Sequence, residues 1–194
     1  MEALVVSSAF GYFNPTLVAD MWNSGKAIVQ PREAGRVHFA CSAELGRRHF
    51  SDLDGLPEFC AAAEAIDNAA DPVGLALYTG YRAEPLVEDL PGRAMQLVTV
   101  LREFRGSAHL IAVRGYELNA KTAHFMRRPN DMGMFGWSDD DSPEIGDIER
   151  EKLAAADRLT DRLVAPAYGA VDDPGQKAIL AGLDQMEAAL DAAK

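Results

Sequence analysis

The positions of the prolines constrain the fold of this chain more than any other feature. Seven of the ten stand where a helix could begin: Pro15, Pro31, Pro57, Pro72, Pro91, Pro143 and Pro174. Proline suits the first helical turn because its missing N–H has no partner there and its φ angle is already helical. Four of the seven follow or adjoin a residue whose side chain can cap a helix: Asn14, Asp71, Ser142 and Asp173.

Apolar residues recur at helical spacing between these starts, and no run of β-branched residues alternates with polar ones. We therefore predict an all-α fold, a compact bundle of about eight or nine helices with a long helical pair at the C-terminus. The expected ranges are 2–12, 15–24, 31–50, 56–70, 73–83, 91–115, 117–128, 143–172 and 174–193. Residues 128–147 are expected to form one long irregular loop, and Pro166 should kink or split the helix in which it lies.

Length and charge limit the possible classes of protein. A chain of 194 residues fits one domain, 1–194, because domains hold roughly 100–200 residues. The net charge of −11 repels phosphate backbones, so we expect nucleic acid to be an unlikely partner. The short basic runs Arg47-Arg48-His49 and Arg127-Arg128 are interpreted as cations that offset helix dipoles. No segment is long and apolar enough to span a membrane, and we expect a soluble, cytoplasmic protein.

The helix expected at 91–115 carries the most unusual polar residues. On a helical projection centred on Leu101, Arg105 falls inside the apolar arc and His109 lies at its edge. A guanidinium stays charged, so Arg105 requires a carboxylate, a carbonyl or an anionic ligand. Two interpretations stay open, a structural ion pair with another helix and an anion-holding arginine beside a titratable histidine. Gly106 suggests in addition that a neighbouring helix or a ligand approaches the backbone there.

Other candidate residues lie outside this helix. Tyr12 is a candidate for a pocket wall, and Trp137 is a candidate cover for a pocket under the irregular loop. We expect no metal site, because the four histidines show no ligand-pair spacing, and we expect no cofactor, since no phosphate-binding glycine loop occurs. Exposed faces of the long C-terminal helices are compatible with a homodimer.

Several stretches resemble the SalK-like family, a group of uncharacterised actinobacterial proteins classed with helix-turn-helix proteins. They are Phe10–Pro15 with Leu17-Val18, Leu101–His109, Gly136–Asp139 and Leu159–Pro166. The resemblance spans most of the chain in order. This chain differs from the family pattern in a shorter N-terminus and in a reduced winged-helix region after Ser138. In addition, Phe104 stands where the family has a histidine, and Ser107 stands where it has an aspartate. A histidine-rich site of the family would therefore be incomplete in this chain.

Three functions remain open from the sequence. The first is a helical small-ligand-binding or regulator-related protein without nucleic-acid contact. The second is an enzyme or accessory factor of small-molecule metabolism, in which Arg105 holds a small anionic molecule, His109 acts as acid or base, and Tyr12 orients the substrate. The third is a DNA-binding regulator. The candidate ligand-binding residues are Tyr12, Arg102, Arg105, His109 and Trp137.

Overall fold

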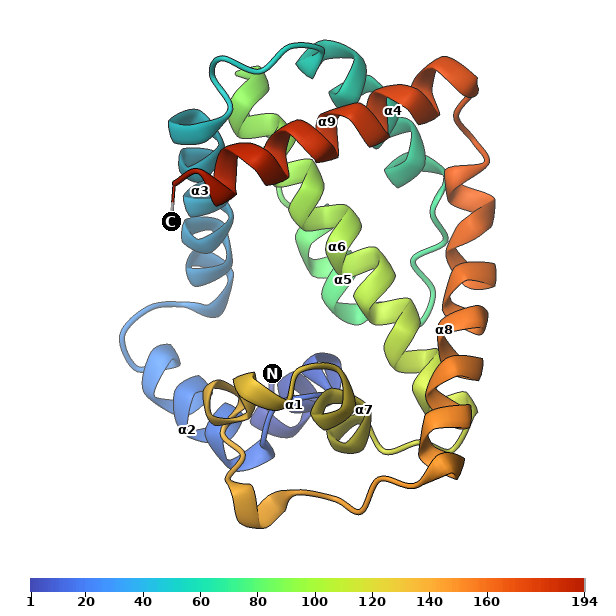
Figure 1. The fold of residues 1–194 in the computed structure, drawn as a ribbon. Helices are drawn as coiled ribbons and strands as arrows, with labels where there is room; N and C mark the ends of the chain where they lie inside the picture. Colours follow the sequence, from blue (N-terminus) through green and yellow to red (C-terminus); the bar gives the residue numbers. More distant parts are fainter. Residues whose placement is uncertain (194) are drawn as a thin grey trace.

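Helices make up nearly all of the regular structure. The computed structural model describes residues 1–193, in which nine α-helices and two short 3₁₀ helices (η) occur without any strand (Figure 1). Their bounds are α1 Ala3–Phe10, α2 Pro15–Lys26, α3 Pro31–His49, α4 Leu56–Ala69, α5 Ala76–Arg82, α6 Leu90–Gly115, α7 Ala120–Arg127, η1 Pro129–Phe135, η2 Asp139–Asp141, α8 Asp147–Tyr168 and α9 Asp173–Asp191. The all-α prediction is confirmed.

Most of the predicted helix starts are confirmed. Five of the seven prolines stand in the first turn of an α-helix: Pro15, Pro31, Pro57, Pro91 and Pro174. Asn14 caps α2 as expected, since its Oδ1 accepts the N–H of Thr16 at 2.9 Å. The cap of α9 is Asp172 rather than Asp173, because the Asp172 side chain accepts the N–H of Gly175.

Pro72 and Pro143 do not begin helices, so these two predictions were wrong. Asp71 Oδ1 accepts the N–H of Val73 at 3.0 Å in a local turn, and Gly74 follows at φ +79°. This left-handed residue delays the start of α5. Helix α8 starts at Asp147 because the Glu149 carboxylate accepts the N–H of Gly146 at 2.8 Å, which fixes its first turn. Pro166 lies in the last turn of α8 and does not split it.

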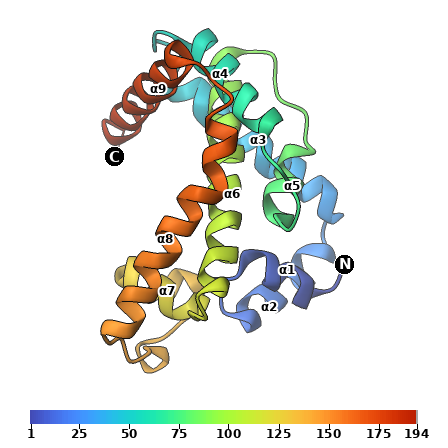
Figure 2. The same ribbon diagram turned by 90° about the vertical axis from the view of Figure 1, so that its right-hand side faces the viewer.

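The centre of the fold is α6, against which α3, α4, α5 and α8 pack (Figures 1 and 2). The main hydrophobic core joins these helices with α9 and includes Phe59, Tyr78 and Leu97, all of which are almost fully buried. Helices α3 and α6 approach closely at Gly46, where an added Cβ would lie 2.2 Å from the Pro91 carbonyl oxygen. A side chain at this position would separate the two helices.

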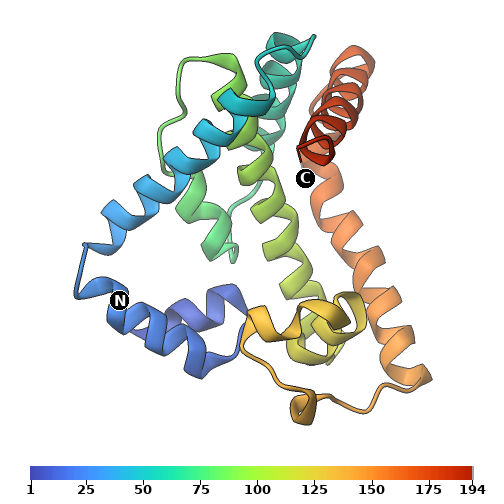
Figure 3. The ribbon, with the colours of Figure 1, turned by 60° about the vertical axis from the view of Figure 1, so that its left-hand side comes forward.

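A second, smaller core lies at the other end of α6. It holds Ala112 and Val113 of α6, Leu118, Ala123 of α7 and Ala156 of α8, with neighbours packed around them. The α1–α2 pair lies beside α7 at this end, while α9 crosses the opposite end over α4 (Figure 3). None of the described helices has the length and apolar character that crossing a lipid bilayer requires.

Candidate functional site

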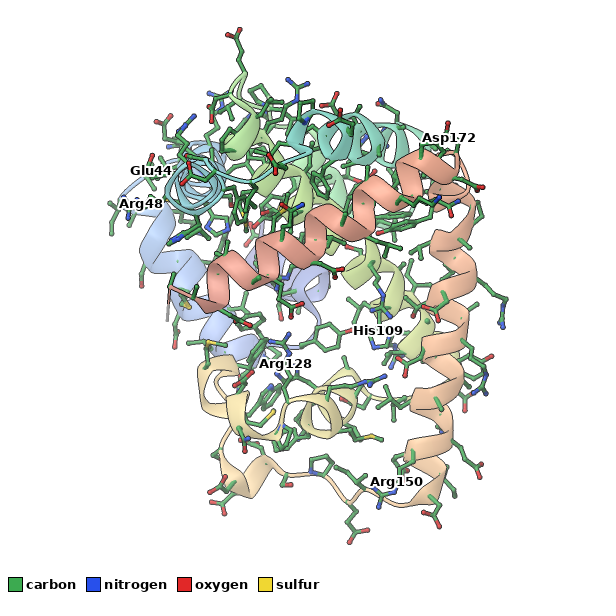
Figure 4. All side chains as sticks on the ribbon, turned by 45° about the horizontal axis from the view of Figure 1, so that its top comes forward. Glu44, Arg48, His109, Arg128, Arg150 and Asp172 are labelled. Carbon is green, nitrogen blue, oxygen red and sulfur yellow. The ribbon has the colours of Figure 1, made fainter. Side chains whose placement is uncertain are left out.

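A cavity of about 630 Å³ lies between α3, α5, α6, α7, α8 and the end of α1 with the turn that follows it. Figure 4 shows two residues that line it, His109 on α6 and Arg128 directly after α7, near the middle of the molecule. The side chains that line it come from distant parts of the sequence, from Ala9 to Asp157. This size is typical of a small-molecule site.

Hydrogen bonds hold the α1–α2 turn against the loop that follows α7. The backbone N–H of Asn14 donates to the Phe135 carbonyl and the Asn14 side-chain amide donates to the Gly136 carbonyl, both at 2.9 Å. Trp137 Nε1 donates to the Tyr12 carbonyl oxygen at 2.8 Å. These bonds fix the turn beside the cavity and set the position from which the Tyr12 ring enters it.

Three polar atoms of the cavity wall are buried without a hydrogen-bond partner among the described residues. They are the hydroxyl oxygens of Tyr12 and Ser107 and the Nε2 atom of His124. Burial raises the pKa of Tyr12 to about 12, so its hydroxyl remains protonated and able to donate. Unpaired buried polar groups cost about 1–3 kcal/mol each, so three of them in one cavity wall favour a polar occupant.

The proton of His109 can be assigned from its neighbour. His109 Nδ1 lies 2.9 Å from Thr160 Oγ1, and the single hydroxyl proton of Thr160 is donated to the Ala156 carbonyl at 2.8 Å. Thr160 Oγ1 therefore accepts from Nδ1–H, which leaves Nε2 of the neutral ring as an acceptor. Burial lowers the pKa of His109, so the neutral form is favoured despite Asp157 at 3.9 Å.

Arginines outnumber carboxylates around this cavity. Four arginines line it, while two carboxylates do so: Arg102, Arg105, Arg127 and Arg128 against Glu103 and Asp157. Arg102 pairs with Glu103 at 2.7 Å and Arg127 contacts Asp157. Arg105 lies 3.6 Å from Asp161, and both side chains are more than half exposed. Arg128 lies 3.6 Å from Asp131, so each of the four arginines has a carboxylate partner, although only two of these carboxylates line the cavity. The lining groups taken alone carry more positive than negative charge, in a chain whose net charge is −11.

Four of the five residues singled out from the sequence line this cavity: Tyr12, Arg102, Arg105 and His109. Trp137 does not contribute to the wall and instead holds the backbone of Tyr12. Arg105 was expected within the apolar arc of its helix, but 51% of its side chain is exposed. Arg105 lines the cavity instead of a tight contact between helices. Gly106 faces the same space, and the nearest atom to an added Cβ, Glu103 Oε2, is 3.9 Å away.

Sequence reasoning missed other residues of the wall. Ser107 and His124 have buried, unpartnered polar atoms, and Arg127 and Arg128 supply half of the arginines. The sequence predicts only a helix-end role for the Arg127-Arg128 pair, whereas both arginines line the cavity. The available signal was the run from His124 to Arg128, which places a histidine one turn before two arginines. No group of three or more histidine, cysteine, aspartate or glutamate side chains within residues 1–193 is placed to hold a metal ion.

These features define an all-α protein with a polar, cationic cavity beside its central helix. The chain belongs to a helix-turn-helix family, whose family model matches residues 1–194. No curated protein and no solved structure matches the chain. Membership of a helix-turn-helix family overturns the expectation that nucleic acid is an unlikely partner. That expectation used the net charge, which sums over the whole surface, whereas binding depends on the groups at one contact face.

Proposed function

We propose that this protein is a DNA-binding regulator whose cavity beside α6 binds a small anionic molecule that controls the contact with DNA. The observation that carries the ligand site is the set of three buried, unpartnered polar atoms next to four arginines. The arginines attract a negative charge. The Tyr12 and Ser107 hydroxyls and His124 Nε2 have almost no accessible surface and no partner among the described residues, so an occupant gains their hydrogen bonds where neighbouring side chains move aside.

The resemblance to SalK-like proteins supports the same cavity. Tyr12 belongs to the first of the resembling stretches and Arg105 and His109 to the second. Trp137 of the third stretch bonds to the Tyr12 carbonyl, and Thr160 of the fourth bonds to His109. Four segments that are far apart in the sequence thus meet around one space, which favours a shared role in binding.

The family membership supports the DNA contact, and α1 and α2 have the form of the motif. They are two packed helices joined by the four residues 11–14, and the turn starts with Gly11 at φ +67°. The same turn carries Tyr12 into the cavity wall. An occupant that contacts Tyr12 and α6 together therefore fixes the placement of the helix pair, which links ligand binding to DNA binding.

The ligand site is tested with two fluorescent probes of nearly equal shape. 8-Anilino-1-naphthalenesulfonate carries an anion, and N-phenyl-1-naphthylamine has the same rings without it. We expect saturable binding of the sulfonate at one site and a clear preference for it over the neutral probe. Equal affinity for both probes, or binding of the sulfonate only by the acid-expanded protein, would contradict an anion site.

The DNA contact is tested separately by fluorescence anisotropy with a duplex from the region upstream of the protein's own gene. We expect binding at low salt with an affinity that falls as salt rises. Lys26→Gln, in the last turn of the exposed face of α2, should lower the salt slope by about one, because one phosphate contact is lost. Lys177→Gln on α9, at the other end of the molecule, is the matched control and should change nothing. No binding at low salt would refute the regulator function.

A second candidate is an enzyme or accessory factor of small-molecule metabolism. The observation that favours it is His109, whose Nε2 acceptor lies in the same wall as Arg105 and Tyr12. In that case Nε2 accepts a proton from a bound anionic substrate that Arg105 orients. Recovery of a bound ligand in chemically unchanged form after long incubation would exclude this candidate.

A further inference from the structure

Aromatic rings make up most of the apolar wall of the cavity beside α6. Eight aromatic side chains line it, histidines included, whereas only two leucines do so as large aliphatic side chains. Six of the eight form a continuous chain in which neighbouring ring centroids lie between 3.9 and 6.5 Å apart. At such spacings neighbouring rings interact, so the chain forms one aromatic surface. In order, its rings are Phe10, Phe13, Phe135, His124, Tyr12 and His109.

This aromatic surface is separate from the two hydrophobic cores. In the part of the chain that the structure describes, neither core includes any of the six rings. Phe10 is 37% exposed, and Tyr12, Phe13 and Phe135 are only partly buried. The core helices therefore do not use up the faces and edges of these rings. Since all six line the cavity, the surface is available to an occupant.

Positive charge lies beside one end of the aromatic surface. Burial is the main cause that lowers the pKa of His109, and the charges of Arg105 and Arg127 lower it further. Burial raises the pKa of Tyr12, and the charge of Arg105 opposes this rise. The pair of Arg105 with Asp161 is 3.6 Å long and exposed, so water already competes with it. An anion that reaches this end of the surface can therefore replace the carboxylate at Arg105.

We infer that the cavity beside α6 takes a flat aromatic ring system that bears an acidic group, such as an aromatic carboxylic acid with two or more fused rings. The inference rests on the function proposed above and adds the chemical class of the anion to it. The rings of the acid lie against the aromatic surface, and its carboxylate lies at Arg105. A single benzene ring would fill only a small part of the cavity of about 630 Å³, so we expect at least two rings.

The test compares 2-naphthoate with trans-decahydro-2-naphthoate, which has the same carbon skeleton and carboxylate but no aromatic ring. Hydrophobic burial alone favours the saturated acid, because it has more apolar surface. Contacts between rings favour the aromatic acid. Isothermal titration calorimetry of the full chain at neutral pH should show 2-naphthoate binding about 2- to 10-fold more tightly, the gain from one ring contact. Equal affinities, tighter binding of the saturated acid, or no binding of either acid would overturn the inference.

A third ligand separates this inference from the anion site on which it rests. The alcohol 2-naphthalenemethanol keeps the two rings and lacks the charge, and we expect it to bind more weakly than 2-naphthoate. Equal binding of the two acids with weak binding of the alcohol would leave the anion site in place and overturn the aromatic class alone. Equal binding of 2-naphthoate and the alcohol would overturn the anion site, and the inference with it.

Variants locate the preference on the aromatic surface. Phe135 stands in the middle of the ring chain, with centroids 4.2 Å from Phe13 and 3.9 Å from His124. Phe135→Leu should lower the affinity for 2-naphthoate about 2- to 10-fold and leave that for the saturated acid unchanged. The matched control is Phe125→Leu, because Phe125 is buried in α7 and does not line the cavity. It should leave the preference for 2-naphthoate unchanged.

A second variant keeps the test valid should Phe135→Leu disturb the fold. Phe10 begins the ring chain and is 37% exposed, so Phe10→Leu should cost little stability. It should also reduce the preference for 2-naphthoate over the saturated acid. Both acids are titrated into the same protein, so the ratio of their affinities does not depend on the fraction that is folded. An unchanged ratio in Phe10→Leu would overturn the inference.

Discussion

Trp137 and Tyr12, which are 125 positions apart in the sequence, are joined by a hydrogen bond from the indole Nε1 to the Tyr12 carbonyl oxygen at 2.8 Å. The bond connects the loop after α7 to the turn between α1 and α2. Since Tyr12 lines the cavity and Trp137 does not, Trp137 acts on the cavity through the backbone of Tyr12 rather than by touching an occupant.

Trp137→Phe should remove this bond and leave the Tyr12 carbonyl unpaired. The expected loss in the free energy of unfolding is about 1–3 kcal/mol, the cost of a partly buried acceptor without a donor. Urea denaturation followed by circular dichroism measures it. Lys121→Met is the matched control, because it removes the cation 5.1 Å from the Trp137 ring and leaves the hydrogen bond in place. Equal losses for the two variants would show that the ring contact matters more than the bond.

Arg105→Met should weaken binding of the anionic probe and leave the free energy of unfolding almost unchanged. The pair with Asp161 is long, at 3.6 Å, and both side chains are exposed, so its loss should cost less than about 1 kcal/mol. The affinity for 8-anilino-1-naphthalenesulfonate should fall about tenfold or more, because a charge-assisted contact is lost, while the affinity for N-phenyl-1-naphthylamine stays unchanged. Asp161→Asn removes the partner and keeps the guanidinium, and it should leave sulfonate binding equal or stronger. A parallel fall for both probes would mean that Arg105 supports the cavity only sterically.

The fold could be predicted from the sequence because its determinants are local. A proline at N1 and the cap at Asn14 act within one helical turn, and the sequence therefore places α2, α3 and α6 within a few residues of their observed bounds. The prediction that a helix begins at Pro143 was wrong, because the capping contact of Glu149 with Gly146 lies further along the chain and determines the start of α8.

The site was only partly predictable, since burial of a polar atom depends on distant segments. The helical projection placed Arg105 inside the apolar arc of α6 and His109 at its edge, but it could not show that a cavity lies beside Arg105, whose side chain is 51% exposed. Ser107 and His124 look ordinary in the sequence. Their polar atoms are notable only because the fold buries them without partners.

The free energy of unfolding should decrease as the pH falls below about 6.5. Burial lowers the pKa of both His109 and His124 from the ordinary value of 6.5. The two histidines therefore bind protons near pH 6.5 in the unfolded chain and only at lower pH in the folded chain. Their contribution to the free energy of unfolding is complete above pH 6.5 and is lost as the pH falls through their pKa values in the folded protein. His109→Gln should flatten this decline in urea denaturation series between pH 8 and 5. An unchanged slope would contradict the burial of the His109 ring.

Gly106→Ala should increase stability and weaken ligand binding at the same time. A Cβ at this position meets no atom closer than Glu103 Oε2 at 3.9 Å, so the methyl group fits, and the helix gains up to about 1 kcal/mol from the lost flexibility of glycine. Gly35→Ala in α3 is the control, because its Cβ meets nothing within 4 Å and Gly35 lies outside the cavity beside α6. Both variants should raise the midpoint of thermal unfolding. Only Gly106→Ala should reduce the affinity for the naphthalenesulfonate probe, since its methyl group occupies space in the cavity wall. Equal affinity of the two variants for the probe would place the bound anion away from the middle of α6.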